Sequence, residues 1–344
     1  MCPPQHKIGE IAAVLVNEED NLISSIVSFI DHKSQETDIM IFKFDNKEIA
    51  DAIIRQNNKN SRFRLLIDIR STTHPMTDTA GNTYSCSVLD DLYKHDINLR
   101  VFDIEPAILH HKVILKDSML LIGSANFFTK DLLNNHESIL SIANDTTVII
   151  FTREFNRLWK STNAIEYENL PHERKSEVSD IQSPIETNCS KPKLAGSKFR
   201  ANLTSINFSP LNFEKHLNHK ILAGKDSILI QASIIRSTKI ISSLLRKADE
   251  GTKIKILTNI ANEHPLGPLN DHKNISIKYF KNPAGMLHEK TILIDNDKVL
   301  YGTVNMFERS LKHDQEHILT FEGVESYMQF YANWIKNWEH PNFN

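Results

Sequence analysis

The feature that most constrains this chain is an internal repeat. Residues 110–117 read HHKVILKD and residues 288–295 read HEKTILID, so that His, Lys and Asp recur at an offset of 178 residues (288 − 110). Residues 123–126 (GSAN) recur as residues 302–305 (GTVN) at an offset of 179 (302 − 123). Two copies of such a compound pattern indicate a duplicated structural unit, because chance rarely aligns so many spaced positions.

Weaker similarities extend the repeat to either side of these motifs. FRLLIDI at residues 63–69 echoes IKILTNI at residues 254–260, and F-x3-W at residues 155–159 echoes the same pattern at residues 330–334. Each half also alternates short apolar runs with stretches of helical period, which predicts α/β lobes with mixed sheets. The predicted organisation is a first lobe at 1–160, a polar linker or surface loop at 161–200, and a second lobe at 201–344.

The repeated residue types predict chemistry on an anion. In a strand, side chains repeat every two residues, so the His and the Lys of each HxK point to the same face. The ammonium is a fixed positive charge, and the imidazole is a nucleophile or proton carrier near neutral pH. A Ser or Thr hydroxyl and an Asn amide add hydrogen-bond donors, and a later Glu can accept from the second imidazole nitrogen.

Two such sets around one point fit a phosphodiester, with one His attacking phosphorus and the other protonating the leaving oxygen. The sequence does not assign either Glu to either His. The predicted catalytic residues are His110, His288, Lys112, Lys290, Glu137 and Glu316. The predicted phosphate-binding residues are Lys112, Lys290, Asn126, Asn305, Ser124 and Thr303. Asp117 and Asp295 are expected at strand ends, where they would bond loop backbone.

On these residues the chain resembles the phospholipase D superfamily, whose mark is a duplicated HxKxxxxD motif with G[ST]xN and a later acidic residue. The resemblance covers both halves. It implies two similar lobes, each a mixed sheet flanked by helices, related by a pseudo-twofold axis with the active site at their interface. It also implies a phosphohistidine route without metal or other cofactor, with His110 as nucleophile and His288 as general acid. The second copy departs by having Thr303 where Ser is usual, which keeps the hydroxyl.

Composition bounds the partners and the compartment. Lys and Arg number 40 against 43 Asp and Glu, a net charge of −3, which argues against binding nucleic acid through overall positive charge but leaves a local basic groove open. The three cysteines are far apart, which excludes a disulfide scaffold or a cysteine zinc site. No apolar run is long enough to span a membrane, so we expect a cytoplasmic or peripheral membrane protein, with export lacking a cleaved leader left open. Both motifs lie in one chain, which predicts a monomer.

The favoured interpretation is a phospholipid-acting enzyme that hydrolyses or transfers a headgroup, and three alternatives stand beside it. The same reaction on DNA or RNA would make the chain a nuclease, and a non-enzymatic scaffold is disfavoured by the intact motifs. Residues 313–317 (HDQEH) also spell the H-x-x-E-H zinc-protease signature. That chemistry needs both histidines on one helix face, whereas the sequence predicts a strand from Glu316 onward.

Overall fold

The computed structural model describes residues 8–17, 20–59, 61–71, 75–170, 196–209 and 212–343. The chain divides into two compact units. We call the one comprising Val14–Leu133 and Ser138–Gly196 the N-terminal unit. The other comprises Met1–Ala13, Asn134–Glu137 and Ser197–Asn344, and we call it the C-terminal unit. A four-residue segment, Asn134–Glu137, therefore leaves the first half of the sequence to pack with the second.

The N-terminal unit is built on a mixed sheet. Its strands lie in the order β10 (Ala164–Glu166), β6 (Asn98–Phe102), β3 (Arg62–Asp68), β2 (Glu36–Ile41), β7 (Lys112–Lys116), β8 (Met119–Gly123) and β9 (Ser138–Ala143). Strands β2, β3 and β6 pair in parallel, whereas β7, β8 and β9 continue the sheet as an antiparallel meander and β10 pairs antiparallel with β6.

The C-terminal unit repeats this plan. Its strands lie in the order β14 (Ile275–Phe280), β13 (Lys253–Asn259), β12 (Ser227–Ala232), β15 (Lys290–Ile294), β16 (Lys298–Gly302), β17 (His317–Glu322) and β11 (Ser197–Phe208). Strands β12, β13 and β14 are parallel, and β15, β16 and β17 form the meander. Strands β12, β13, β14 and β15 thus correspond to β2, β3, β6 and β7.

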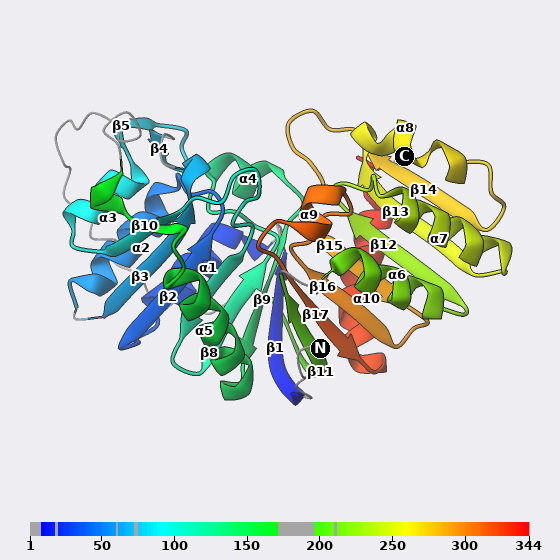
Figure 1. Cartoon of the computed structure of the whole chain (residues 1–344), viewed down its shortest axis with the longest axis horizontal. Helices are drawn as coiled ribbons and strands as arrows, with labels where there is room; N and C mark the ends of the chain where they lie inside the picture. The colour runs from blue at the N-terminus through cyan, green and yellow to red at the C-terminus, as the bar shows by residue number, and fades with distance from the viewer. Residues whose placement is uncertain are drawn as a thin grey trace. The chain divides into compact units, whose positions relative to one another are not determined.

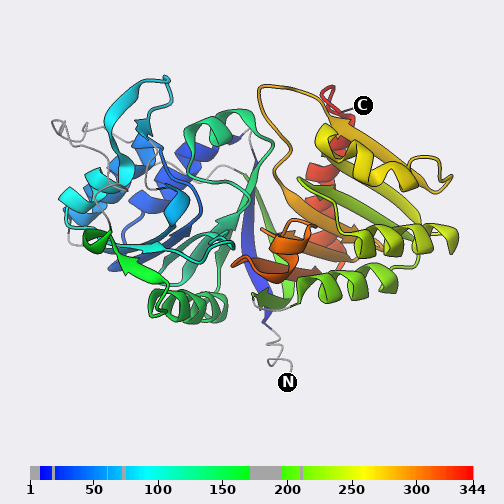
Figure 2. The same cartoon turned by 45° about the horizontal axis from the view of Figure 1, so that its top comes forward.

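Helices cover both faces of each sheet. In the C-terminal unit, α6 (Phe213–Ala223) and α7 (Thr238–Asp249) lie side by side over a core that includes Ile230, Ile256 and Ile292, while α10 (Val324–Glu339) packs on β15, β16 and β17 (Figure 1). Figure 2 shows α10 behind the sheet and α6 and α7 in front of it. In the N-terminal unit, α1 (Leu22–Asp31), α2 (Lys47–Asn57) and α3 (Val88–Lys94) take one face, and α5 (Asp145–Trp159) packs on β7 and β8.

The remaining elements are short or connect these layers. They are β1 (Gly9–Asn17), η2 (Ile69–Ser71), β4 (Pro75–Thr77), β5 (Thr83–Ser87), α4 (Thr129–Asn134), η3 (Tyr167–Asn169), η5 (Ile260–Asn262), α8 (Glu263–Leu266), η6 (Gly267–Leu269) and α9 (Glu308–Lys312). No helix of the described ranges is long and apolar enough to cross a membrane.

The final Asp of each motif occupies a hairpin turn. Asp117 has φ 37° and Asp295 has φ 53°, a left-handed backbone that Asp and Asn tolerate better than most residues. The Asp295 carboxylate accepts the backbone N–H groups of Lys225, Asp226 and Ser227 at 2.8 to 3.1 Å. Asp117 accepts the Ser34 hydroxyl at 3.2 Å. Both contacts tie the hairpin to the loop entering the neighbouring parallel strand.

The predicted fold class is confirmed: each unit is an α/β lobe with a mixed sheet flanked by helices. One local expectation is wrong, because β7 begins at Lys112 and β15 at Lys290, so both motif histidines precede their strands. The domain boundaries at 160 and 200 stay a prediction. Of the predicted linker, residues 171–195 lie outside the described residues, and residues 164–166 form β10.

Candidate active site

The C-terminal unit joins a histidine and a glutamate that lie far apart in sequence. The His288 Nδ1 atom is 2.7 Å from Oε1 of Glu137, and the Glu137 side chain is fully buried. A carboxylate only accepts, so Nδ1 carries the proton and donates it to Glu137. This bond fixes the ring and leaves Nε2 as the nitrogen available to exchange a proton with a substrate. The glutamate that the sequence left unassigned is therefore the partner of His288.

The chain brings Glu137 to His288 by a tight backbone contact. His136 forms a parallel bridge with Leu287, its N–H donates to Met286 O at 2.9 Å, and its carbonyl accepts the His288 N–H at 2.9 Å. At Gly285 a Cβ atom would lie 1.8 Å from Asn134 O. Only glycine allows the backbone to approach so closely, and this approach places the glutamate beside the imidazole.

The other predicted residues of the second copy surround the same strand ends. Lys290 is buried, and its ammonium donates to the carbonyl of His288. The Asn305 backbone N–H donates to Ser310 Oγ at 2.8 Å, and that hydroxyl donates to Glu316 Oε1 at 2.6 Å. The Asn305 side-chain Oδ1 is buried without a hydrogen-bond partner in the described part of the chain. Buried polar atoms are normally satisfied, so this amide retains capacity for a ligand or a water.

Around His110, the N-terminal unit repeats the lysine and asparagine features of the second copy. His110 is 4% exposed and meets the Phe42 ring edge to face at 5.3 Å between centroids. The Lys112 ammonium donates to the His110 carbonyl at 2.7 Å and lies 5.4 Å from the centre of the Phe42 ring. Asn126 Nδ2 donates to Asp131 Oδ2 at 3.1 Å, and Asn126 Oδ1 is a second buried amide oxygen that no described residue satisfies.

A buried aspartate holds the loop that follows Asn126. Asp45 Oδ1 accepts the Thr129 backbone N–H at 2.6 Å and its hydroxyl at 2.9 Å. Burial raises the pKa of the Asp45 carboxyl to about 6. The Phe127 backbone also bonds the segment after β2, donating to Lys43 O at 2.9 Å. The motif asparagine is thus anchored to the loop after the neighbouring strand.

The glycine and the hydroxyl residue of GSAN and of GTVN hold their strand against the neighbouring strand of the sheet. The Ser138 N–H donates to Ser124 Oγ at 3.0 Å, and the His317 N–H donates to Thr303 Oγ1 at 3.1 Å. A Cβ at the preceding Gly123 would lie 2.3 Å from Ser138 O, and Gly302 is equally crowded by the backbone of β17. The structure therefore assigns Ser124 and Thr303 a visible role in holding the strand.

Sequence reasoning missed one pair of positioning residues. Asp68, at the end of β3, accepts the Leu109 N–H at 2.8 Å. Asn259, at the end of β13, accepts the Leu287 N–H at 2.9 Å and donates to its carbonyl at 2.8 Å. Each therefore fixes the backbone one residue before a motif histidine. The signal was present, because FRLLIDI and IKILTNI align Asp68 with Asn259.

The residue between His and Lys in each motif points to the helix on the outer face. His111 is fully buried, 3.8 Å from Glu154 of α5, and burial lowers the pKa of its imidazole. Glu289 accepts hydrogen bonds from Gln231 and Asn333, each at 2.9 Å, and Asn333 belongs to α10. Both residues face away from the motif lysine, as expected from strand alternation.

The HDQEH segment does not have the geometry of a zinc protease. His313 is the C-cap of α9 and His317 is the first residue of β17, so no single helix carries both histidines. Within the described ranges, no group of three His, Cys, Asp or Glu side chains is arranged to hold a metal ion.

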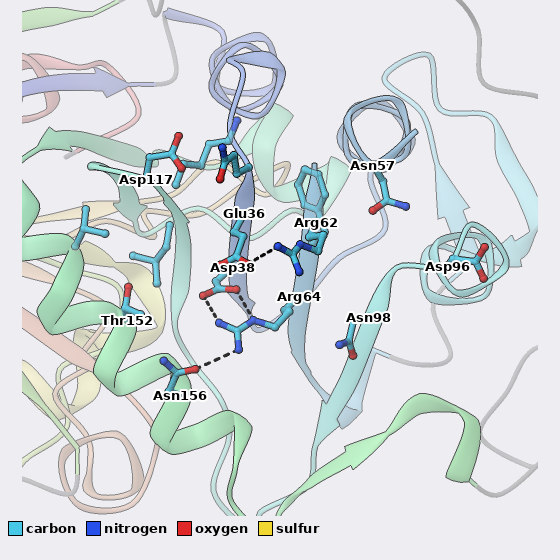
Figure 3. A pocket seen from close by; sticks show the side chains of 15 residues that line it. Glu36, Asp38, Asn57, Arg62, Arg64, Asp96, Asn98, Asp117, Thr152 and Asn156 are labelled. Carbon is cyan, nitrogen blue, oxygen red and sulfur yellow. Dashed lines mark hydrogen bonds and ion pairs between the residues drawn. The ribbon is translucent and has the colours of Figure 1, made fainter. Parts of the chain in front are cut away.

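A large groove of the N-terminal unit lies away from His110. It measures about 760 Å³ and lies at the far end of β7, where it is lined by Lys116 and Asp117. Figure 3 shows Arg64 reaching Asp38 through two hydrogen bonds, 2.7 and 2.8 Å long, and donating to Asn156. The charged side chains that line this groove are largely paired with one another, and none of the predicted catalytic residues lines it.

Comparison with known proteins identifies the family. Residues 26–159 and 217–338 match the family model described as "Cardiolipin synthase, PLD-like domain", one stretch in each copy of the repeat. The chain belongs to this family of phospholipase D-like domains, which confirms the resemblance found in the sequence.

Individual relatives match over shorter ranges. Human mitochondrial cardiolipin hydrolase is 29% identical over 135 residues, which are 39% of this chain and 49% of the relative. Phospholipase D of Rickettsia conorii is 25% identical over 139 residues, 40% of this chain and 69% of the relative. The chain thus spans about half the length of the human cardiolipin hydrolase that it matches.

Two solved structures share the fold at low sequence identity. Phosphatidylserine synthase of Haemophilus influenzae has a TM-score of 0.71 and 12% identity, covering 96% of this chain and 87% of that protein. Polyphosphate kinase of Porphyromonas gingivalis has a TM-score of 0.57 and 10% identity, covering 90% of this chain and 47% of that protein.

Proposed function

We propose that this chain is a phospholipase D-type phosphodiesterase that acts on a phospholipid, by hydrolysis or by transfer of the phosphatidyl group to an alcohol. The observation that carries the proposal is the buried pair of His288 with Glu137 beside Lys290, in which the glutamate of the first motif copy meets the histidine of the second. A histidine oriented by a carboxylate is suited to exchange protons with a reacting group.

The proposed reaction has two steps. In the first, His110 attacks phosphorus, a P–N bond forms, and the bond to the leaving oxygen breaks as His288 gives that oxygen its Nε2 proton. In the second, water or an alcohol attacks the phosphohistidine, His288 takes its proton, and the P–N bond breaks. The Glu137 carboxylate stabilises the positive charge that His288 carries between proton transfers.

The repeat supports roles for the remaining residues. By analogy with Glu137, we propose that Glu316 orients His110. We propose that Lys112 and Lys290, with the two motif asparagines, hold the non-bridging oxygens. These donors supply the charge stabilisation for which many phosphoryl-transfer enzymes use a metal. We therefore expect the enzyme to remain active in excess EDTA.

Phospholipid is the favoured substrate class for two reasons. The description of the matching family model names cardiolipin synthase, and relatives carry the names cardiolipin hydrolase and phospholipase D. The net charge of −3 also offers no overall attraction to nucleic acid. We expect a monomer that works as a peripheral protein at the membrane surface.

Substrate class is tested by incubating the purified chain, always with EDTA, with labelled phosphatidylcholine, phosphatidylglycerol and cardiolipin vesicles and with plasmid and single-stranded DNA. We expect headgroup release or exchange from at least one lipid and none from the His110→Ala variant. Cleavage of DNA without lipid turnover would make the chain a nuclease. Strict dependence on added Mg²⁺ or Zn²⁺ would refute the mechanism.

The roles of the two histidines are tested by acid-quenched mass spectrometry after brief exposure to a nitrophenyl phosphodiester. We expect label on residue 110 in wild type, none in His110→Ala, and accumulated label in His288→Ala. Label on residue 288 alone would reverse the assignment, and label on neither residue in an active enzyme would favour direct attack by water.

A further inference from the structure

In the N-terminal unit a tryptophan closes a charge-paired cluster. Trp159, at the end of α5, lies against Arg64 of β3 and Arg100 of β6, with 5.6 and 4.7 Å from each guanidinium carbon to the ring centre. Arg64 makes a two-bond ion pair with Asp38, and Arg100 lies 2.8 Å from Glu166. Trp159 is only 7% exposed, so this cluster is part of the packed structure.

The C-terminal unit builds the same cluster without the acids. Trp338 of α10 lies against Lys255 of β13 and Lys278 of β14, with 5.1 and 5.0 Å from each ammonium to the ring centre. Lys278 donates to the Trp338 carbonyl at 2.8 Å, and Arg100 donates to the Trp159 carbonyl at 2.7 Å. The structural counterpart of Trp159 is therefore Trp338.

The missing acids follow from strand register. Asp38 is the β2 partner of Arg64, and the matching β12 partner of Lys255 is Leu229. Glu166 comes from β10, whose Ala164 pairs antiparallel with Phe102 of β6, whereas the corresponding antiparallel contact on β14 is the single bridge of Phe280 with Phe343, which places no described carboxylate opposite Lys278. Neither Lys255 nor Lys278 has a carboxylate within ion-pair distance in the described part of the chain.

The Lys255 and Lys278 ammonium groups, with no described carboxylate beside them, and the partly buried indole of Trp338 form a cationic, amphipathic surface. Its apolar part continues along α10 through Val324, Met328, Tyr331 and Ile335, which with Trp338 fall within an arc of about 80° at 100° per residue. Val324 is 64% exposed and Met328 is 50% exposed. Exposed apolar stripes with Trp and Lys are typical of helices that lie in a membrane interface.

We propose that Lys255, Lys278, Trp338 and the apolar stripe of α10 form a docking surface for an anionic phospholipid bilayer. Lipid phosphates take the place that Asp38 and Glu166 hold in the other copy, and the indole and the stripe enter the headgroup layer. This surface lies outside the catalytic motifs. Its proposed role as a membrane contact rests on the proposed function, in which the substrate is a phospholipid. It would hold the enzyme at the surface where that substrate is found.

The test is co-sedimentation of the full chain with phosphatidylcholine vesicles, with and without phosphatidylglycerol, at low ionic strength. We expect binding to the anionic vesicles, weakened by salt. The double variant Lys255→Gln/Lys278→Gln should lower the partition coefficient about 30-fold, from two lysines each adding to attraction at an anionic surface. The control Lys215→Gln/Lys220→Gln removes the same charge from α6, on the opposite face, and should bind as wild type.

A second variant removes the attraction without removing the lysines. Leu229→Asp places a carboxylate beside Lys255, as Asp38 stands beside Arg64, and should also weaken vesicle binding. If it fails to fold, the lysine pair alone decides. Equal binding by wild type and Lys255→Gln/Lys278→Gln would overturn the proposal.

Binding of a ligand other than a bilayer at this surface would give distinct results. Inorganic phosphate that binds the lysines while anionic vesicles do not would indicate a free-anion site and overturn the docking surface. Loss of single-stranded DNA binding in the lysine variant, with vesicle binding unchanged, would overturn it in favour of nucleic acid. Turnover of a soluble nitrophenyl phosphodiester should be the same in wild type and the lysine variant. An enzyme that docks on vesicles but neither hydrolyses a phospholipid nor transfers its phosphatidyl group would refute the proposed function and leave the docking surface standing.

Discussion

Replacing Glu137 by Gln tests the central contact of the proposed site. The substitution keeps the shape of the side chain but removes its charge, 2.7 Å from His288 Nδ1 and fully buried from water. Hydrogen bonds to charged groups contribute about 1.5–3 kcal/mol. If that stabilisation is realised when His288 is positively charged, its loss lowers kcat about 10- to 150-fold, at 1.36 kcal/mol per factor of ten, with little change in KM.

The assay separates the two chemical steps. With a nitrophenyl phosphodiester the leaving oxygen needs no proton, so the first-turnover burst of nitrophenolate should survive in Glu137→Gln. Steady-state turnover should fall, because the second step still needs His288 as a base. With a phospholipid both steps should slow.

Glu289→Gln is the matched control. Glu289 is also a buried carboxylate within the motif, but it accepts from Gln231 and Asn333 on the far side of the strand. This variant should lower the melting temperature while folded enzyme keeps its kcat. An equal loss of kcat in both variants would show general disruption and refute the reasoning, as would a Glu137→Gln enzyme with unchanged steady-state turnover.

Three further outcomes can be measured on the same protein. Gly285→Ala, whose Cβ would meet Asn134 O at 1.8 Å, should displace the segment that carries Glu137 and lower both melting temperature and kcat; unchanged values would contradict the tight approach. Burial raises the pKa of the Asp45 carboxyl from 3.8 to about 6, so the neutral carboxyl favours the folded state below pH 4 and this stabilisation is lost as the pH rises through 6. Urea titrations should therefore find Asp45→Asn more stable than wild type above pH 6 but not at pH 4. The pKa of Lys116 is lowered to about 8 by burial, so wild type should gain stability relative to Lys116→Met between pH 8 and 10.5, and a flat difference would refute that burial cost.

Most of the fold followed from the repeat because the repeat is itself structural. Apolar runs such as residues 227–232 and 253–259 became adjacent parallel strands, and the 178-residue offset carried the architecture of one lobe to the other. The sequence placed the motif histidines inside strands, whereas each precedes its strand. There the backbone is held by Asp68 or Asn259 through side-chain bonds that strand periodicity does not encode.

The pairing of Glu137 with His288 could not be predicted, because the sequence is symmetric in this respect. Each histidine is followed by a glutamate at nearly the same distance, so spacing alone favours neither partner. The choice is made by three-dimensional backbone packing at Gly285, where Asn134–Glu137 joins the C-terminal unit. A contact of this kind depends on long-range packing that no local propensity reports.

The F-x3-W similarity shows that a real repeat can be aligned to the wrong residue. By sequence, Trp159 matches Trp334, since both follow Phe by four residues. By contacts it matches Trp338, which shares its pair of basic neighbours and its carbonyl bond. Aromatic residues stack along the whole of α10, so several registers satisfy the pattern equally.

The two copies also differ in charge where their geometry agrees, and this difference bears on the roles of the histidines. Behind His110 the backbone is held by Asp68, a fully buried carboxylate that bonds Arg70, whereas behind His288 the same bond comes from the neutral amide of Asn259. A second carboxylate near His288 would add to the charge of Glu137 and hold the imidazolium more tightly, which would make its proton harder to give up. A neutral anchor avoids that while fixing the backbone equally well. This supports the proposal that His288, with one carboxylate partner assigned, is the histidine that exchanges protons with the substrate.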